Sequence, residues 1–232
     1  MLRTIQYSFP SKADGLEISC LAVVPELERN EKYRGIIQIV HGMSEYKERY
    51  IPFMEYMAER KYISVIHDHR GHGKSVRSKE DLGYMYGGGA DAMLQDIHTV
   101  NCLIKDHFPG IPLILFGHSM GSLAVRAYAA HHDSCMDMLI VCGSPSNRRA
   151  RIAGSVIAKL EGKLFGMRHR SRLLEILSFG NYAARFSGEK NQKRMDLFGS
   201  GGISGLYGLR TLRIYVYGRC LSGSVSADEK SL

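Results

Sequence analysis

Cysteine is one of the residue types that this sequence has little of. Its five cysteines are widely spaced and odd in number, and no two of them form a C-x-x-C pair. This pattern argues against both a disulfide framework and a zinc site. The ten histidines add no metal signal, because His131 and His132 fall at the end of an expected helix and suit its C-terminal dipole and solvent better than a ligand set. We expect buried thiols, no metal and no cofactor.

Long hydrophobic runs are also absent. No stretch reaches the roughly 20 apolar residues of a membrane-spanning helix, and the start of the chain, Met1 to Thr4, is followed by no apolar signal segment. The sequence therefore predicts a cytoplasmic protein. With 232 residues and 44% hydrophobic content, the chain can bury one substantial core.

The most informative motif is Gly117-His118-Ser119-Met120-Gly121, directly behind the apolar run 111–116. In the G-x-S-x-G pattern the serine occupies a strained turn between a strand and a helix, and glycines leave room for the sharp reversal. Residues 122–130 are rich in Ala and Leu and suit a helix whose dipole points at the serine. The motif predicts Ser119 as a catalytic nucleophile. A glycine-rich turn with an incidental serine is the alternative.

A second glycine turn, His41-Gly42-Met43-Ser44-Glu45, follows the β-branched run 35–40. Acyl transfer by a serine needs two backbone N–H donors aimed at the developing oxyanion. The residue after the nucleophile supplies one donor, and a loop behind an earlier strand supplies the other. Met120 and Met43 fit these positions. We expect His41 and Gly42 to have structural roles in the turn, like Gly117 and Gly121 at the serine.

A third loop, residues 68–75 (DHRGHGKS), follows the apolar run 62–66. It ends in Gly-Lys-Ser like a nucleotide-binding loop, but a single residue separates Gly71 from Gly73, so the spacing of that loop is absent. In this order, the three segments resemble the α/β-hydrolase superfamily, in particular its branch of monoacylglycerol lipases, lysophospholipases and proline-type serine aminopeptidases. The resemblance covers roughly residues 10 to 190.

The resemblance implies a function and roles for single residues. Ser119 would be the nucleophile, Met43 and Met120 the oxyanion donors, and loop 68–75 a structural brace. The implied activity is hydrolysis of a carboxylic ester, most simply a monoacylglycerol or lysophospholipid. A peptidase or small-ester hydrolase on the same fold is one alternative. A catalytically dead binding domain is another.

The periodicity of the chain predicts an α/β fold, with a mostly parallel sheet covered by helices on both faces. We expect an α/β-hydrolase core over 1–146, a basic helical cap over 147–190 and an atypical tail over 191–232. Within the core, strands are expected at 4–9, 17–24, 35–40, 62–66, 111–116 and 137–142, the last of them buried, and helices near 51–60, 90–107 and 122–130.

The cap segment carries most of the net charge of +8. A basic amphipathic cap suits contact with an anionic membrane from which a lipid ester is drawn. A solvated charged face is the alternative. Nucleic acid is not expected as a partner, because the basic residues lack interleaved aromatic positions and no binding motif is present.

The end of the chain departs from the resemblance. A serine nucleophile of this kind is followed by an acid and then a histidine. None of the candidates after Ser119 stands where the family has these residues, so no triad acid or histidine is assigned: His131, His132, His169, Asp133, Asp137, Asp196 and Asp228. From Gln192 the sequence becomes glycine-rich. We expect that a changed reading frame near 191–193 replaced the native ending and removed the C-terminal strands. The alternative is that 211–217 forms a genuine strand.

Overall fold

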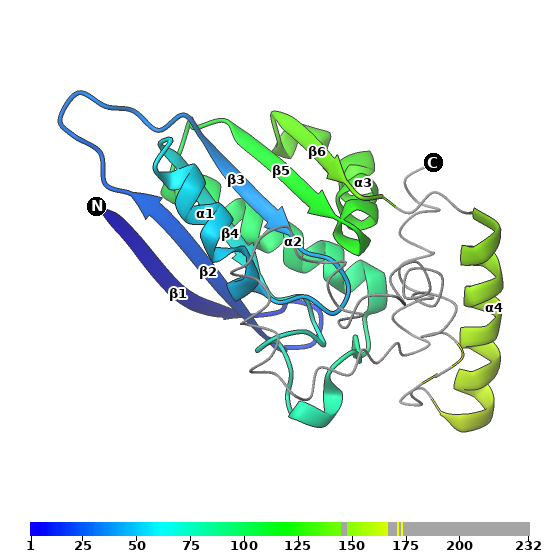
Figure 1. Ribbon diagram of the computed structural model, residues 1–232. Helices are drawn as coiled ribbons and strands as arrows, with labels where there is room; N and C mark the ends of the chain where they lie inside the picture. Colours follow the sequence, from blue (N-terminus) through cyan, green and yellow to red (C-terminus); the bar gives the residue numbers. More distant parts are fainter. Residues whose placement is uncertain (145–147, 167–170, 172, 174–232) are drawn as a thin grey trace, which may run out of the picture.

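The computed structural model describes residues 1–144, 148–166, 171 and 173 (Figure 1). Its centre is one six-stranded sheet of order β1-β2-β4-β3-β5-β6. The first two strands form an antiparallel hairpin, and the last four run parallel to one another. This confirms the mostly parallel α/β sheet. The strands are β1 (Leu2–Pro10), β2 (Glu17–Pro25), β3 (Gly35–Val40), β4 (Tyr62–His67), β5 (Leu113–His118) and β6 (Met138–Cys142).

Helices cover both faces of the sheet, as the sequence predicts. Helix α1 (Ile51–Ala58) packs on one face, and α2 (Gly89–His107) and α3 (Met120–His132) pack on the other (Figure 1). Side chains of β3 alternate between the two faces: Ile37 and Ile39 lie in the cluster with α1, whereas Ile36 and Val40 lie in the cluster with α2 and α3. Such two-sided burial is typical of parallel strands and explains their continuous apolar runs.

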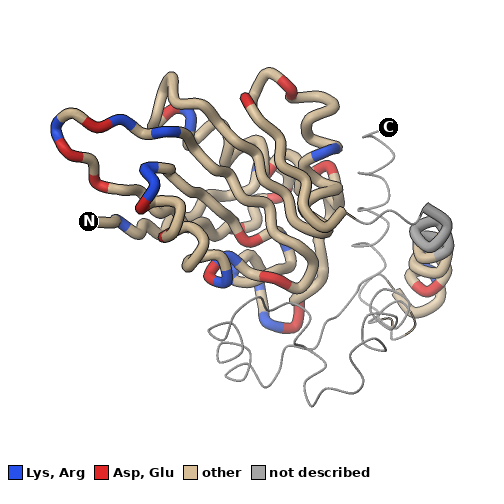
Figure 2. Tube along the Cα trace, turned by 45° about the horizontal axis from the view of Figure 1, so that its top comes forward, with Lys and Arg blue, Asp and Glu red and all other residues tan. Residues whose placement is uncertain are grey.

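Charged residues lie at the margins of this sheet. Figure 2 shows lysine, arginine, aspartate and glutamate concentrated in the connecting segments, and the sequences of β3, β4, β5 and β6 contain none. Strand β5 begins two residues later than expected, behind Pro112, and runs on to His118. The three glycine-containing loops therefore begin together at the carboxyl ends of β3, β4 and β5, and most of the polar residues lie there or in the other connections.

Strand β6 is not the buried strand that the sequence predicts. Its apolar side chains from Met138 to Val141 are 37–54% exposed. The reason is its place at the edge of the sheet, where, within the described residues, it pairs only with β5. The sequence of an edge strand can be as apolar as that of a central strand, so it does not show whether a further strand covers it.

The expectation of buried thiols is wrong for Cys102 and Cys142, which are exposed.

Helix α4 (Arg148–Phe165) follows β6 and falls within the expected cap. It lies beyond the β6 side of the sheet (Figure 1). The rest of the cap and the tail from 191 onward lie outside the described residues, apart from Gly166, Ser171 and Leu173. The alternative strand at 211–217 also lies outside them. Among the helices that the structure describes, none combines the length and the apolar character that crossing a membrane requires.

Arg70, directly behind β4, is completely buried and joins three parts of the fold. Its Nε donates to Asp96 on α2 at 3.0 Å, and its terminal nitrogens donate to Asp14 and Ser11 in the β1–β2 turn and to the carbonyl of Met85. All of these partners are acceptors, so the guanidinium is satisfied without water. Removing it would leave the carboxylate of Asp96 buried without its cation.

We predict that Arg70→Met lowers the free energy of unfolding by about 3–5 kcal/mol, because breaking a buried ion pair from one side strands the other charge. Urea denaturation measures this. The control is Arg29→Ala, an exposed arginine in the β2–β3 connection, which should change the stability by less than about 0.5 kcal/mol. Equal effects of the two substitutions would contradict a structural role for Arg70.

Candidate active site

Ser119 lies at the turn between β5 and α3. Its backbone has φ 51° and ψ −116°, a region that costs a residue with a side chain on the order of 1–3 kcal/mol. Two hydrogen bonds hold the turn: the Ser119 N–H donates to the carbonyl of Cys142 at 2.9 Å, and the Ser119 carbonyl accepts from the Ser122 N–H at 2.9 Å. The strand-to-helix turn that the motif predicts is therefore present, and its serine is half-buried.

The two glycines of the motif are sites of close approach. A Cβ built on Gly121 would lie 2.0 Å from the carbonyl oxygen of Val40, and one on Gly117 would lie 2.5 Å from the carbonyl oxygen of Gly121. Neither glycine has a positive φ, so space, and not backbone freedom, requires glycine here. The first turn of α3 consequently lies directly against the end of β3.

The loop behind β3 reaches Ser119. A Cβ on Gly42 would lie 3.1 Å from the Cβ of Ser119, so the turn that begins at His41 forms one wall beside the serine. Met43 follows on this turn, half-buried against the core. Met120 is the first residue of α3, where backbone N–H groups have no acceptor within the helix. The structure thus brings both expected donor residues onto segments that flank Ser119.

Glu45 braces this loop, a role that the sequence analysis did not assign. One of its carboxylate oxygens accepts from the Gly42 N–H at 2.7 Å, from the Tyr50 hydroxyl at 2.7 Å and from His118 Nδ1 at 3.2 Å. Burial alone would raise the pKa of the Glu45 carboxyl, but these hydrogen bonds outweigh it and lower the pKa to about 2. The signal in the sequence is its place three residues after Gly42.

His41 is held by backbone groups on both sides of its ring. Its Nδ1 donates to the Gly42 carbonyl at 2.7 Å, and its Nε2 accepts from the His69 N–H at 3.0 Å. Burial lowers the pKa of His41. Burial, and to a smaller extent the nearby His41 ring, lowers the pKa of His67 to about 3 and that of His72 to about 4. The rings form a neutral buried group, which agrees with a structural role for His41.

The loop of residues 68–75 is folded around Asp68. This buried carboxylate accepts from the Lys47 ammonium at 2.6 Å and from the backbone N–H groups of Lys47 and Lys74. Gly73 has φ 49°, and a Cβ on it would collide with the Asp68 carboxylate. The loop is therefore filled by its own acid and leaves no cradle for a phosphate, as the spacing of its glycines indicates.

Four of the candidate acids and histidines that follow Ser119 lie away from it: His131, His132, Asp133 and Asp137. Helix α3 has 13 residues, which puts His131 and His132 roughly 18 Å from Ser119. Asp133 follows them, and Asp137 accepts from the Leu113 N–H at the start of β5, the opposite end of that strand. The other candidates lie outside the described residues: His169, Asp196 and Asp228.

We predict that Gly121→Ala destabilises the chain by about 3 kcal/mol or more, because the added carbon meets backbone that cannot move without shifting β3. Thermal or urea unfolding measures this. Gly154→Ala is the matched control, since it is also a helical glycine but has nothing within 4 Å of its Cβ. It should be neutral or stabilise by up to about 1 kcal/mol. A mild effect at Gly121 would show that α3 and β3 are not in close contact.

Known proteins share this architecture. A carboxyl esterase from Bacillus coagulans matches 97% of the chain with a TM-score of 0.82 at 24% identity, over 72% of its own length. A soluble variant of monoglyceride lipase from Saccharomyces cerevisiae matches 97% of the chain with a TM-score of 0.63 at 21% identity, over 68% of its own length. At these identities the likeness shows the fold, and it confirms the α/β-hydrolase architecture.

Sequence relatives agree. The chain is 27% identical to a monoacylglycerol lipase of Mycolicibacterium smegmatis over 56% of its length, and 26% identical to a monoglyceride lipase of Rattus norvegicus over 72% of its length. It spans about half the length of these relatives, 46% and 51%. The family described as "Serine aminopeptidase, S33" matches residues 31–198, well over half of the chain. The chain belongs to this serine aminopeptidase S33 family.

Proposed function

We propose that the chain carries the nucleophile and oxyanion-binding part of a serine ester hydrolase acting on a monoacylglycerol or a related lipid ester. The observation that carries this proposal is the strained backbone of Ser119, a non-glycine residue with φ 51° held against the Gly42 turn. Strain of this kind persists where surrounding contacts enforce it and is concentrated at active sites. Relatives named as monoglyceride lipases support the choice of substrate.

The proposed chemistry begins at the Ser119 hydroxyl. Its oxygen attacks the ester carbonyl carbon, and the carbonyl oxygen becomes an oxyanion that accepts hydrogen bonds from the N–H groups of Met43 and Met120. A general base takes the serine proton and passes it to the leaving alkoxide as the intermediate collapses. The alcohol departs, and the acyl-enzyme left on Ser119 is then hydrolysed by water. Glu45 contributes indirectly, because its hydrogen bond to the Gly42 N–H fixes the turn that bears Met43.

A general base must take the serine proton. Neither His131 nor His132 can do so from the far end of α3. His169 is the remaining histidine after Ser119 in the printed sequence. Loss of the histidine from a catalytic triad lowers kcat by roughly 10⁴ to 10⁶, while oxyanion and binding contributions remain.

We predict slow hydrolysis of a monoacylglycerol and of a short-chain nitrophenyl ester by the 232-residue chain, about 10⁴- to 10⁶-fold below an intact triad. Ser119→Ala should change this residual turnover little, because oxyanion and binding contributions do not use the serine, but it should block labelling by a fluorophosphonate, which mass spectrometry locates on Ser119. His131→Ala, on the same helix but remote from the serine, should leave both unchanged.

Two outcomes would revise this picture. Equal fluorophosphonate labelling of the wild type and Ser119→Ala would refute the nucleophile. Fast turnover abolished by His169→Ala would keep Ser119 and identify the base. A peptidase activity, the alternative suggested by the family description, is separated by running an aminoacyl anilide in parallel with the esters.

We further propose that α4 contacts an anionic membrane surface. Val156, Leu160 and Leu164 are 52%, 55% and 73% exposed and stand four residues apart, so they form one apolar stripe along the helix. Lys159 and Lys163 are exposed beside it. An apolar stripe next to cations is the pattern of a helix that lies in a lipid interface. A purely solvated face would not account for three exposed apolar side chains in one row.

We predict that the chain co-sediments with anionic vesicles at low salt and much less at high salt, because each lysine near the surface contributes about 1 kcal/mol and is screened by ions. Replacing both Lys159 and Lys163 with glutamate should weaken binding by at least about 10-fold, whereas Lys32→Glu in the exposed β2–β3 connection should not. Binding that ignores lipid charge and salt would favour the solvated face.

A further inference from the structure

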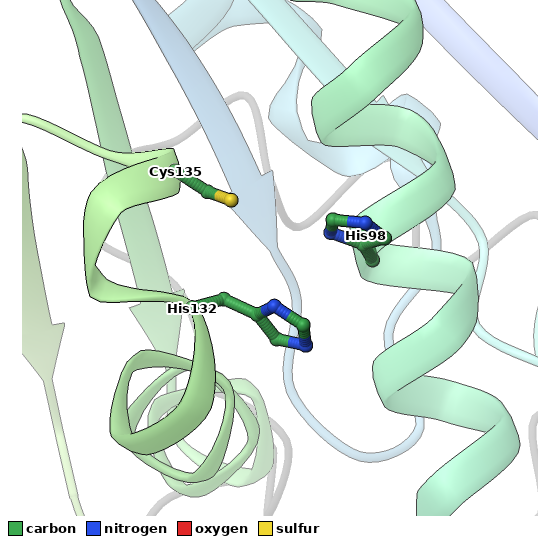
Figure 3. Close-up of side chains that lie close together, drawn as sticks. All are labelled: His98, His132 and Cys135. Carbon is green, nitrogen blue, oxygen red and sulfur yellow. The ribbon is translucent and has the colours of Figure 1, made fainter.

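Two pairs of metal-binding side chains meet where the end of α3 packs beside α2. His98 and Cys102 are four residues apart on α2 and share a face of the helix. His132 ends α3, and Cys135 ends the short helix η3 (Asp133–Cys135). Ligand atoms of His98, His132 and Cys135 lie within 4.8 Å of one another. Figure 3 shows the three side chains projecting into the same gap from separate elements.

Cys102 supplies a fourth donor. Its Sγ lies 3.5 Å from His98 Nε2. Zinc binds imidazole nitrogen at about 2.0–2.1 Å and thiolate sulfur at about 2.3 Å, so tetrahedral geometry separates neighbouring nitrogen and sulfur ligands by roughly 3.6 Å. The His98–Cys102 pair already has this separation. The ligand atoms of His98, His132 and Cys135 need to approach one another by roughly 1 Å, and Cys102 must turn towards His132 and Cys135 to complete the set.

The His98 ring is oriented for such a role. Its Nδ1 is hydrogen-bonded to the hydroxyl of the fully buried Tyr128 at 2.9 Å, which leaves Nε2 for the gap. Metal-binding imidazoles are usually fixed in this way through their second nitrogen. The His132 ring stacks on those of Tyr128 and His98 with centroids 4.6 Å apart, and its plane is 21° from that of His98. A metal lies in the plane of each imidazole that binds it, so the His132 ring must rotate out of this stack to bind the same ion as His98.

The surroundings permit entry. Cys102 is exposed, and the other three donors are half-buried, so an ion can reach the gap from solvent. Two thiolates and two neutral imidazoles balance the charge of one divalent ion.

We propose that His98, Cys102, His132 and Cys135 form a Cys₂His₂ site for Zn²⁺, or a divalent ion of similar softness, which clamps the end of α3 to α2. Mixed thiolate and imidazole donors select such ions over Mg²⁺ or Ca²⁺. The site lies at the end of α3 opposite Ser119 and is separate from the candidate active site. No metal is expected from the sequence, because the two pairs, H-x₃-C and H-x₂-C, lie far apart in the chain and contain no C-x-x-C.

The test is metal titration of the reduced full-length chain with Zn²⁺, and with Co²⁺ as a spectroscopic probe. We expect one ion per chain and a thiolate-to-cobalt charge-transfer band. Cys135→Ser and His132→Ala should each weaken binding by more than about 100-fold, and Tyr128→Phe by about 10- to 100-fold, the range for partners that orient a ligand. His131→Ala, an exposed histidine next to the site, is the matched control and should bind like the wild type.

A second measurement needs no variant. Zn²⁺ should protect Cys102 and Cys135 from alkylation, whereas Cys142, which is exposed on β6, should react equally with and without the ion. Cobalt bound without a charge-transfer band would overturn the proposal. Unchanged affinity in Cys135→Ser, or equal protection of Cys142, would do so as well.

Discussion

The contact between the first turn of α3 and the end of β3 is the constraint on which the candidate active site depends. Gly121 lies so close to the Val40 carbonyl that no side chain fits between them. This approach leaves the chain a single residue, Ser119, in which to turn from strand into helix, and it forces that residue to a positive φ. The same approach brings the Gly42 turn against the serine. The proposed nucleophile and the proposed oxyanion donors thus depend on the same packing contact.

Beneath this contact the fold buries polar groups in place of hydrocarbon. Asp68 is neutralised by Lys47, Arg70 by Asp96 and Asp14, and the histidines around His41 remain uncharged. Buried ion pairs add little net stability compared with apolar packing, but each one is costly to break from one side. Because an ion pair needs its two charges in contact, these pairs favour a single conformation of the loops behind β3 and β4. Apolar packing, which is not directional, would allow more conformations.

Much of this architecture was predictable because its signals are local. The apolar runs before each glycine loop predict the parallel strands, and the spacing around Ser119 predicts the sharp turn. Glu45 was missed because its place three residues after Gly42 gives no sign of its other partners, Tyr50 and His118, which the fold brings to it. The exposure of β6 was missed because hydrophobicity does not report the presence of a neighbouring strand. His98 and Cys135 were missed as neighbours because helix packing, and not sequence spacing, brings them together.

The backbone at Ser119 separates the demands of folding from those of chemistry. Glycine would adopt φ 51° and ψ −116° without the steric cost that serine bears. If selection acted on stability alone, position 119 would drift towards glycine, and the turn would relax without changing its neighbours. In the proposed mechanism, the hydroxyl of Ser119, and not the fold, accounts for a side chain at this strained position. Stability and the proposed reactivity thus favour different residues at position 119.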